Sequence, residues 1–536
     1  MEAGEFEKMK CRCCYRGETE KEGIDYVLTS TDMPRLSTLR LFMAQEPIEG
    51  EVTKRADISQ AFLRADLEPI PANERRFVMF PKDISPINEN DGLPQVYRMH
   101  KGIYGMHSAG RMWQIMLVKW LKDNGYNQNT IDPTWFTADG VKLIIWTDDL
   151  LIRGTKDATQ KLKNALEQEY GDVRWKPLNY ALGMDISTNS KGWMSINSQS
   201  YCRKMIEKHK MMNITARKQP LTKATKISKA DRAPEVDEIL QKKYLSLLGQ
   251  LVYMATWTRP DIAYATSSLS TVSKSPKPEH FRLALRVLAY CKGTDNLGLS
   301  WKQVDTSDRN QLIVYTDASW ATETDYCSQS GAVFLYNGAP IHWLSKRQEF
   351  PALSSTEAEI MAGCTALREA LYLRRLLESL GQHQSVTEMR FDAMNAIRFN
   401  TNEKVTKRNH HIGARYMRLR HHVQVADITA VFIPTDQQLA DLGTKNPTLD
   451  QFETLRDVLV TPIFCDKNHS VNGIEARVKS EESGPIWSVL APAVATTRCW
   501  KRIPPLDFTP NDLGMHGNAP KRTRINASDD FGHFKS

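Results

Sequence analysis

Short apolar runs, which predict β-strands, alternate with helical patterns of apolar and polar positions over the first 185 residues. The clearest segments are "RFVMFP" (76–81), "KLIIWT" (142–147) and "LLIRG" (150–154). In "ATQKLKNALEQEYG" (158–171) the apolar residues instead recur every three or four positions, which predicts an amphipathic helix. This region is therefore expected to mix strands and helices.

The remainder of the chain divides at the polar segment "KQVDTSDRNQ" (302–311). Residues 240–296 before it are periodic in the manner of helices. After it, "LIVYTD", "SGAVFLY" and "APIHWLS" predict three strands, followed by a long helix over 355–380 and strands at "MRFD" and "TAVFIP". This order predicts an α/β unit, whereas the periodicity fades beyond residue 450 into a polar, basic tail of disordered composition.

Net charge and cysteine content say little about the partners of the protein or its cellular compartment. The net charge of +8 fits a polyanionic partner. The basic stretch at 200–232 is either a solvated face or a surface that follows phosphates. The nine cysteines, including those of "CRCC" (11–14), form neither a disulfide framework nor a metal-binding spacing. Without an apolar N-terminal segment or a run of about 20 apolar residues, an intracellular protein outside the membrane is expected.

The segment "KLIIWTDDLLIRG" places two adjacent aspartates, Asp148 and Asp149, at the tip of a predicted hairpin. A turn alone would tolerate aspartate, because its side chain hydrogen-bonds the local backbone. However, a second short strand in "EVTKRADISQAFLRADL" also ends at an acid, Asp57. Three converging carboxylates repel one another unless a cation compensates them. Oxygen-only clusters suit Mg²⁺, and two such ions about 4 Å apart stabilise an in-line phosphoryl displacement.

Longer motifs around these acids resemble the reverse transcriptase of Ty1/copia-type elements. "ADISQAFLRADL", "VYRMHKGIYGMHSAGRMW", "IIWTDDLLI" and "NYALGMDI" stand in the order and spacing of that family, and "YLSLLGQLVYMATWTRPDIAYATSSLS" resembles its helical connection. The resemblance covers about residues 8–448. It implies that Asp57, Asp148 and Asp149 hold the catalytic metals of the palm, and that the basic stretch at 200–232 lies in the thumb.

A second set of spaced acids follows in the C-terminal unit. "IVYTDASW" ends a strand at Asp317, "MRFDAMNA" ends another at Asp392, and "QQLADLGTK" places Asp441 near the start of a late helix.

Two glutamates, Glu357 and Glu359, lie between those acids in "LSSTEAEIMAG". Ser354-x-x-Glu357 has the spacing of a capping box, which gives Glu357 a structural role. Glu359 lies about 200° further around the helix and cannot face the same way. We therefore assign Glu357 to the cap and Glu359 to the chemistry.

This unit resembles the ribonuclease H domain of the same elements in "YTDASWA", "ALSSTEAE", "FDAMNAI" and "VFIPTDQQLADLGTK". The resemblance implies that Asp317, Glu359, Asp392 and Asp441 bind two Mg²⁺ ions, with Mn²⁺ as the alternative ion. A water would then attack a phosphodiester of RNA paired with DNA. Only the RNA strand is expected to be cut, because the 2′-hydroxyl and the helix shape distinguish it.

Several positions depart from the family pattern near the expected nucleotide site. The family tyrosine before the aspartate pair is Trp146, and the fingers begin late, at a segment where Lys10 and Arg12 match the triphosphate-binding "KARLV". Lys101 and Arg111, in "KGIYGMHSAGRMW", are the other residues expected to contact nucleotide or template.

These inferences define an α+β multidomain chain: a right-hand polymerase of palm, fingers and thumb with a helical connection, then a ribonuclease H-like α/β domain. The expected boundaries are 1–185 for truncated fingers and palm, 186–300 for thumb and connection, 310–450 for the ribonuclease H-like domain and 451–536 for an unassigned, partly disordered tail.

The expected function is RNA-directed DNA synthesis with degradation of RNA in RNA–DNA hybrids. The expected partners are an RNA template, a DNA primer, dNTPs and other products of the retrotransposon polyprotein. Cytoplasmic virus-like particles are the expected location, with access to the nucleus left open. The alternative is a decayed remnant that binds nucleic acid, with ribonuclease H activity only or with no catalysis.

Overall fold

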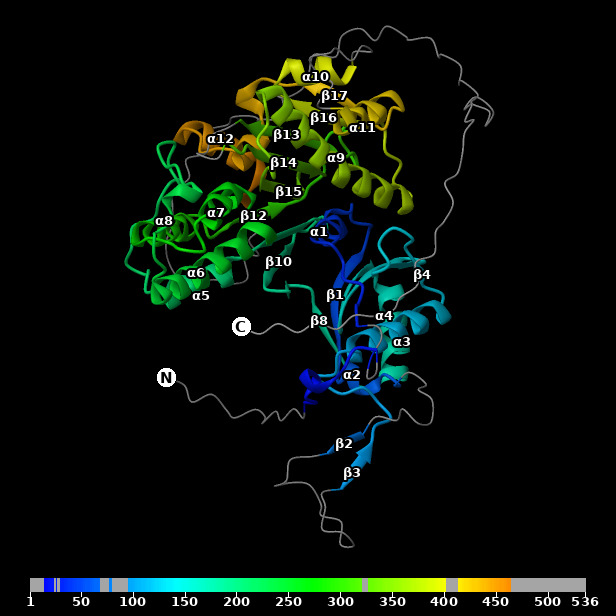
Figure 1. Ribbon diagram of the computed structural model, residues 1–536. Coiled ribbons are helices and arrows are strands. Elements are labelled where there is room, and N and C mark those ends of the chain that lie inside the picture. Colours follow the sequence, from blue (N-terminus) through cyan, green and yellow to red (C-terminus); the bar gives the residue numbers. More distant parts are fainter. Residues whose placement is uncertain are drawn as a thin grey trace, which may run out of the picture. The chain divides into compact units, whose positions relative to one another are not determined.

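Three β-sheets of five or six strands organise the described part of the chain (Figure 1). The computed structural model describes residues 14–23, 26, 29–67, 77–79, 95–320, 326–401 and 413–463. All of them belong to the first of the two units into which the chain divides, residues 1–469. Lys10 and Arg12 lie outside the described residues, as does the chain beyond residue 463.

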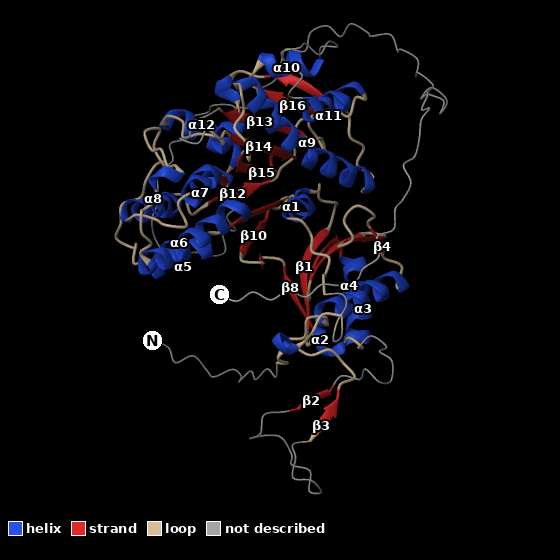
Figure 2. Ribbon diagram, in the orientation of Figure 1, coloured by secondary structure: helices blue, strands red, loops and turns tan. Residues whose placement is uncertain are grey.

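The first sheet is antiparallel and contains the strands predicted around the aspartate pair. Its order is β4 (Asn127–Gln128), β5 (Trp135–Ala138), β6 (Val141–Trp146), β7 (Asp149–Thr155), β1 (Glu51–Ile58) and β8 (Val173–Pro177). Apolar side chains of alternate strand residues join helices α3 (Ala109–Asp123) and α4 (Lys156–Tyr170) in one core (Figure 2). The side chains on the opposite face of β1 are polar. Short elements complete this region: η1 (Gly17–Thr19), α2 (Ala61–Arg64) and the separate hairpin β2 (Phe77–Met79) and β3 (Val96–Arg98).

The second sheet is smaller and is covered by helices. It has the order β18 (Thr461–Pro462), β12 (Leu297–Ser300), β11 (Met194–Asn197), β10 (Met184–Thr188) and β9 (Tyr180–Ala181). The helices are α5 (Gln199–Lys208), η2 (Lys229–Asp231), α6 (Glu238–Trp257), η3 (Pro260–Ile262), α7 (Ala263–Ser270) and α8 (Pro278–Gly293). Among the described helices, none combines the length and the apolar character that a bilayer span requires.

The third sheet is mixed, in the order β15 (Ala339–Arg347), β14 (Gln329–Tyr336), β13 (Ile313–Ser319), β16 (Thr387–Phe391) and β17 (Ile428–Phe432). The first three strands form antiparallel neighbours, whereas β16 and β17 run parallel to β13. The long predicted helix is α9 (Ser355–Ser379), which packs on β13 and β14. The other elements are α10 (Met394–Thr401), α11 (Gly413–Gln424), η5 (Thr435–Gln437), η6 (Leu439–Gly443) and α12 (Leu449–Leu459).

Helix α1 (Leu36–Ala44) is buried almost all round and contacts both the second and the third sheet. Its Arg40 donates hydrogen bonds to backbone carbonyls at the end of α6 and to that of Ile341 in β15. The guanidinium also stacks on Trp343, 3.9 Å from the ring centroid. Burial lowers the pKa of Arg40 to about 9. One N-terminal helix therefore joins segments that lie about 200 and 300 residues further along the chain.

Within "TRPDIA", Arg259 and Asp261 form a buried ion pair, 1% and 3% exposed, with two hydrogen bonds of 2.9 and 2.7 Å. Tyr290 donates a third to Asp261. Burial alone would raise the pKa of Asp261, but the Arg259 charge holds it below its usual value. We expect Asp261→Ala to lower the free energy of unfolding by about 3–5 kcal/mol, because it leaves a buried charge without a partner.

Urea unfolding would measure this loss. The double variant Arg259→Met with Asp261→Leu serves as the control and should lose much less, because both charges are then removed. A loss of less than about 1 kcal/mol for Asp261→Ala would contradict the prediction.

Candidate active sites

The third sheet brings three of the predicted metal ligands together. Asp317 lies near the end of β13 and Asp392 directly follows the parallel strand β16, so both meet at one edge of the sheet. Asp441 approaches from η6. One carboxylate oxygen from each residue lies within 4.8 Å of the other two. Among the described residues, this is the only such group of three His, Cys, Asp or Glu side chains.

Asp441 reaches the cluster through a local structure that differs from the prediction. It lies in the 3-10 turn η6, and the late helix α12 begins only at Leu449. The turn packs directly on β14 at Gly331, where a Cβ atom would lie 2.6 Å from the carbonyl oxygen of Ala440. A side chain at Gly331 would therefore push Asp441 away from Asp317, the residue that lies opposite Gly331 in the pair of strands.

The two glutamates at the start of α9 have the separate roles that helix geometry predicted. The Ser354 hydroxyl accepts a hydrogen bond from the Glu357 amide at 3.1 Å. The Glu357 carboxylate accepts one at 2.7 Å from the Leu353 amide, one residue before the expected position. Glu359, two residues further along the helix, is 7% exposed, and the charges of Asp317 and Asp392 raise its pKa.

Burial and the charges of neighbouring acids raise the pKa values of Glu359, Asp392 and Asp441. Burial, followed by the charges of Asp317 and Asp392, raises the pKa of Glu359 well above its usual value. Burial and the Asp317 charge raise the pKa of Asp441 to about 8. Lys445 lies 2.8 Å from Asp441. Burial would lower the pKa of Lys445, but the neighbouring carboxylates raise it, so the ammonium partly neutralises the cluster.

This donor set fits a divalent cation. It consists of carboxylate oxygens only, and Glu359 Oε2 is buried without a hydrogen-bond partner. Sequence reasoning missed two supporting residues: Thr444, whose hydroxyl donates to Asp317, and Lys445. Lys445 lies four residues after Asp441, a spacing that brings two side chains together on one side of a helix. This spacing was the sequence signal that could have identified Lys445.

The first sheet places the other three acids next to one another in register. Asp57 in β1 lies directly opposite Asp149 in β7, and Asp148 stands in the two-residue turn before Asp149. The other turn residue, Thr147, has a φ of 57°, a left-handed conformation that is strained for a β-branched side chain. The Trp113 indole donates a hydrogen bond of 3.0 Å to the Thr147 carbonyl and so holds the turn.

In contrast to the acids of the third sheet, these acids do not form a cation-binding set as they are arranged. Arg55 donates to both oxygens of Asp149, at 2.9 and 2.8 Å. Burial raises the pKa of Asp149 while the Arg55 hydrogen bonds oppose the shift. Arg174 lies 4.0 Å from Asp57. Arginine thus takes the place that the sequence assigned to Mg²⁺, and we derive no step through a metal here.

The remaining predicted contacts of the nucleotide site have other partners. Lys101 pairs with Asp66, and Arg111 donates to the Ser30 carbonyl at 3.3 Å. Trp146 packs against Trp257 of α6, with ring centroids 5.8 Å apart.

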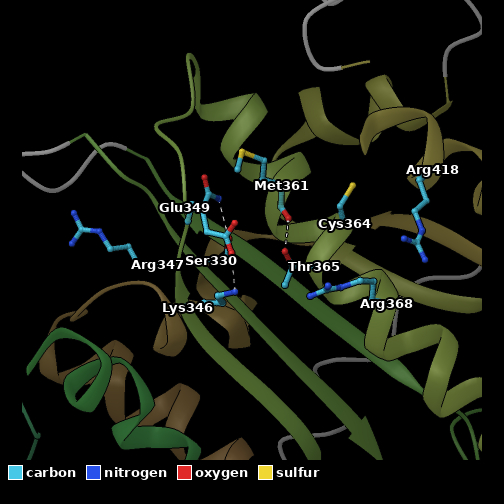
Figure 3. A pocket seen from close by; sticks show the side chains of 10 residues that line it. Ser330, Lys346, Arg347, Glu349, Met361, Cys364, Thr365, Arg368 and Arg418 are labelled. Atoms are coloured by element: carbon cyan, nitrogen blue, oxygen red, sulfur yellow. Dashed lines mark hydrogen bonds and ion pairs between the residues drawn. The ribbon is translucent and has the colours of Figure 1, made fainter. Parts of the chain in front are cut away.

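A basic cavity of about 270 Å³ is lined by residues of β14, α9 and α11 and of the end of β15 (Figure 3). Residues 361, 364, 365 and 368 of α9 line it, a spacing that puts them on one helix face. The cations are Lys346 and Arg347 at the end of β15, Arg368 from α9 and Arg418 from α11, with one acid, Glu349, 3.4 Å from Lys346. Figure 3 shows Arg347 on one side of the cavity and Arg418 on the other.

The buried Gln348 connects this cavity to the acids. Its amide nitrogen donates to Ser330 and to the carbonyl of Ala358, the residue before Glu359, each at 2.9 Å. Its amide oxygen has no hydrogen-bond partner. Gln348 therefore links the wall of the cavity to the first turn of α9, which carries Glu359.

In the metal-free protein, we expect the free energy of unfolding to fall as the pH rises from about 4 to about 8, because Asp441 binds a proton more tightly when folded than when unfolded. Urea unfolding in EDTA at several pH values would measure the slope. Asp441→Asn should flatten it, whereas Asp436→Asn, at an exposed position, should not. Equal slopes for Asp441→Asn and the unaltered chain would contradict the prediction.

Comparison with known proteins agrees with this geometry. Residues 2–223 match the family model of reverse transcriptase (RNA-dependent DNA polymerase). The chain is 28% identical over 465 residues to the retrovirus-related Pol polyprotein from transposon TNT 1-94 of Nicotiana tabacum, covering 84% of this chain and 34% of that protein. It is 27% identical over 453 residues to the Pol polyprotein from transposon RE2 of Arabidopsis thaliana, covering 82% and 30%.

Among solved structures, prototype foamy virus protease-reverse transcriptase superposes over 83% of this chain and 49% of that one, with 12% identity and a TM-score of 0.22. The chain spans about a third of the length of the curated relatives it matches. On these sequence matches, the chain is similar to Ty1/copia-type retrotransposon Pol polyproteins, and its residues 2–223 match the reverse transcriptase family.

Proposed function

We propose that this segment acts as an RNA-directed DNA polymerase fused to a ribonuclease H. The polymerase would join the 3′-hydroxyl of a DNA primer to the α-phosphate of an incoming dNTP on an RNA template. The ribonuclease H would cut the RNA strand of the resulting hybrid. As in its relatives' polyproteins, the chain would work with other Pol products, and we place it in cytoplasmic particles.

The observation that carries the proposal is the cluster of Asp317, Asp392 and Asp441, in which Asp317 and Asp441 are buried and Asp392 is half-buried. Such a cluster is costly to fold unless a ligand uses it, because carboxylates held close together repel one another. We assign Mg²⁺ to it, which when bound supplies charge neutralisation at the phosphate and an acidic water.

The chain's own residues prepare this site before substrate binds. Thr444 fixes one oxygen of Asp317, and Lys445 fixes one of Asp441, so two carboxylates are already oriented. Glu359 and Asp441, whose pKa values are raised, can hold protons that leave when a cation takes their place.

The basic cavity supports the choice of substrate. Four cations and one acid line it, together with Gln348, which donates a hydrogen bond to the carbonyl of Ala358, the residue before Glu359. We propose that phosphates of a nucleic-acid backbone enter this cavity while another part of the same nucleic acid reaches the carboxylates. We therefore propose an RNA–DNA hybrid, rather than a small phosphate ester, as the ligand of this face.

To test the two activities, primer extension on poly(rA)–oligo(dT) would be measured beside cleavage of a labelled RNA–DNA hybrid. We expect Asp148→Asn to slow primer extension and leave RNA cleavage unchanged, and Asp317→Asn to slow RNA cleavage and leave extension unchanged. Each loss should be at least about a hundredfold. If the unaltered chain performs neither reaction but still binds the hybrid, it is a remnant that kept the fold without the chemistry. Cleavage without extension would restrict the function to ribonuclease H.

To test the cavity, Arg368→Gln would be combined with Arg418→Gln. We expect weaker hybrid binding and a slope of log K against log salt that is smaller by about 2, because two phosphate contacts are lost. The matched control is Lys122→Gln with Lys161→Gln, which removes two exposed charges behind the first sheet. An equal loss of hybrid affinity in both double variants would mean that binding depends only on net charge. This result would contradict a specific role of the cavity.

A further inference from the structure

A separate cavity of about 280 Å³, here called the lysine cavity, is lined by helix α4 and by strands β1 and β8. The residues that α4 contributes are Lys156, Thr159, Gln160 and Lys163, and their spacing of three or four puts them on one face of the helix. Strand β8 is the last strand in the order of the first sheet, so the cavity lies where that sheet ends.

The strand register shows which face of the sheet the lysine cavity occupies. Lys54 of β1 lies opposite Pro177 of β8, and Ala56 lies opposite Trp175. Alternate residues of a strand, and residues directly opposite each other, project from the same face of a sheet. Lys54 and Trp175 therefore share the face whose apolar residues pack against α4. Arg55 projects from the other face, so the lysine cavity is separate from the acids of the first sheet.

The charge of the lysine cavity is positive and largely uncompensated. Four lysines are among its described lining residues and no acid is: Lys54, Lys156, Lys163 and Lys176. Of these four, only Lys163 forms an ion pair within the described part of the chain, with Glu167 at 3.7 Å. Positive charges gathered around one concave surface favour an anionic ligand.

Two polar groups of the lining lack a partner. Thr159 is 5% exposed, and its Oγ1 is buried with no hydrogen-bond partner among the described residues. The same holds for Nε1 of Trp175. Leaving a buried donor unpaired costs free energy, so such groups indicate a partner that a ligand supplies. Both groups can donate to an oxygen atom of an anion.

We propose that the lysine cavity binds a nucleotide, with its phosphate among the lysines and its base against the indole of Trp175. Lysine binds phosphate as a point charge, and an indole offers a face on which any base can stack. The volume lies near the lower limit of about 300 Å³ for small-molecule sites, which suits one nucleotide and excludes a duplex. The nucleotide is either free or one unit of a single strand that passes the end of the sheet.

Acetylation of lysine side chains in the full chain, followed by peptide mass spectrometry, tests the proposal at the cavity itself. The probe is 2′-deoxyadenosine 5′-monophosphate (dAMP), added in EDTA at about ten times its dissociation constant. The acetylation rates of Lys156 and Lys176 should fall about tenfold. Lys122 and Lys161 are exposed lysines of α3 and α4 outside the cavity and should keep their rates within about twofold. Protection of no lysine, or equal protection of all four, would overturn the proposal.

A variant without the buried hydroxyl separates a ligand contact from a structural role. Thr159→Val keeps the shape of the side chain and should bind dAMP about tenfold more weakly in a calorimetric titration. Without dAMP it should be as resistant to urea as the unaltered chain, because its hydroxyl has no hydrogen bond to lose. Unchanged dAMP affinity in this variant would overturn the assignment of the hydroxyl to the ligand.

Paired lysine variants and two further probes identify the ligand. Lys156→Gln with Lys176→Gln should weaken dAMP binding about tenfold, and the matched pair Lys122→Gln with Lys161→Gln should change it less than about twofold. Inorganic phosphate should bind at least about tenfold more weakly than dAMP, because it has no base to stack. Equal binding of the two would overturn the assignment to a nucleotide.

A short oligo(dA) distinguishes the two sources of the nucleotide. Protection of Lys156 and Lys176 by oligo(dA) at lower nucleotide concentrations than dAMP would identify a single strand as the natural ligand. Protection at equal concentrations would identify a free nucleotide, and both results support the site. None of these measurements requires primer extension or RNA cleavage, so a failure of the proposed function is distinguishable from a failure of this inference.

Discussion

Like-charged carboxylates held close together are the constraint on which both candidate sites depend. Each site must keep acids in position when no ligand neutralises them, and uncompensated repulsion would drive them apart. The chain meets this requirement from within. Arg55 binds Asp149 in the first sheet, and Lys445 lies 2.8 Å from Asp441 beside the third. The folded chain therefore itself supplies the positive charges that hold the acids of each site in position.

Backbone architecture determines which acids can meet. In the third sheet, the parallel pair β13 and β16 brings Asp317 and Asp392 to one edge, and Gly331 admits the turn that carries Asp441. In the first sheet, a two-residue turn with Thr147 in a left-handed conformation sets Asp149 opposite Asp57. The strain of that turn is offset by neighbouring contacts such as the Trp113 hydrogen bond.

Sequence patterns predicted the features that depend on near neighbours. The strands around Asp148 and Asp149, the long helix α9 and the separate roles of Glu357 and Glu359 all follow from local spacing. Asp441 was placed near the start of a helix, but Gln438 instead directs a 3-10 turn there. The sequence patterns did not identify Arg55, because its partner Asp149 is 94 residues away and only the strand register brings the two together.

The two internal cations differ in a way that separates the behaviour of the sites. An arginine remains charged at any physiological pH, so the pair in the first sheet can be broken only by a competing cation or by salt. In the third sheet, compensation is shared between Lys445 and protons held by acids with raised pKa values, including Asp441 at about 8. Those protons leave as the pH rises, so alkaline conditions alone make this cluster more attractive to a cation. Two sites built from the same carboxylate chemistry are thus compensated differently: by an arginine side chain in one, and by a lysine together with bound protons in the other.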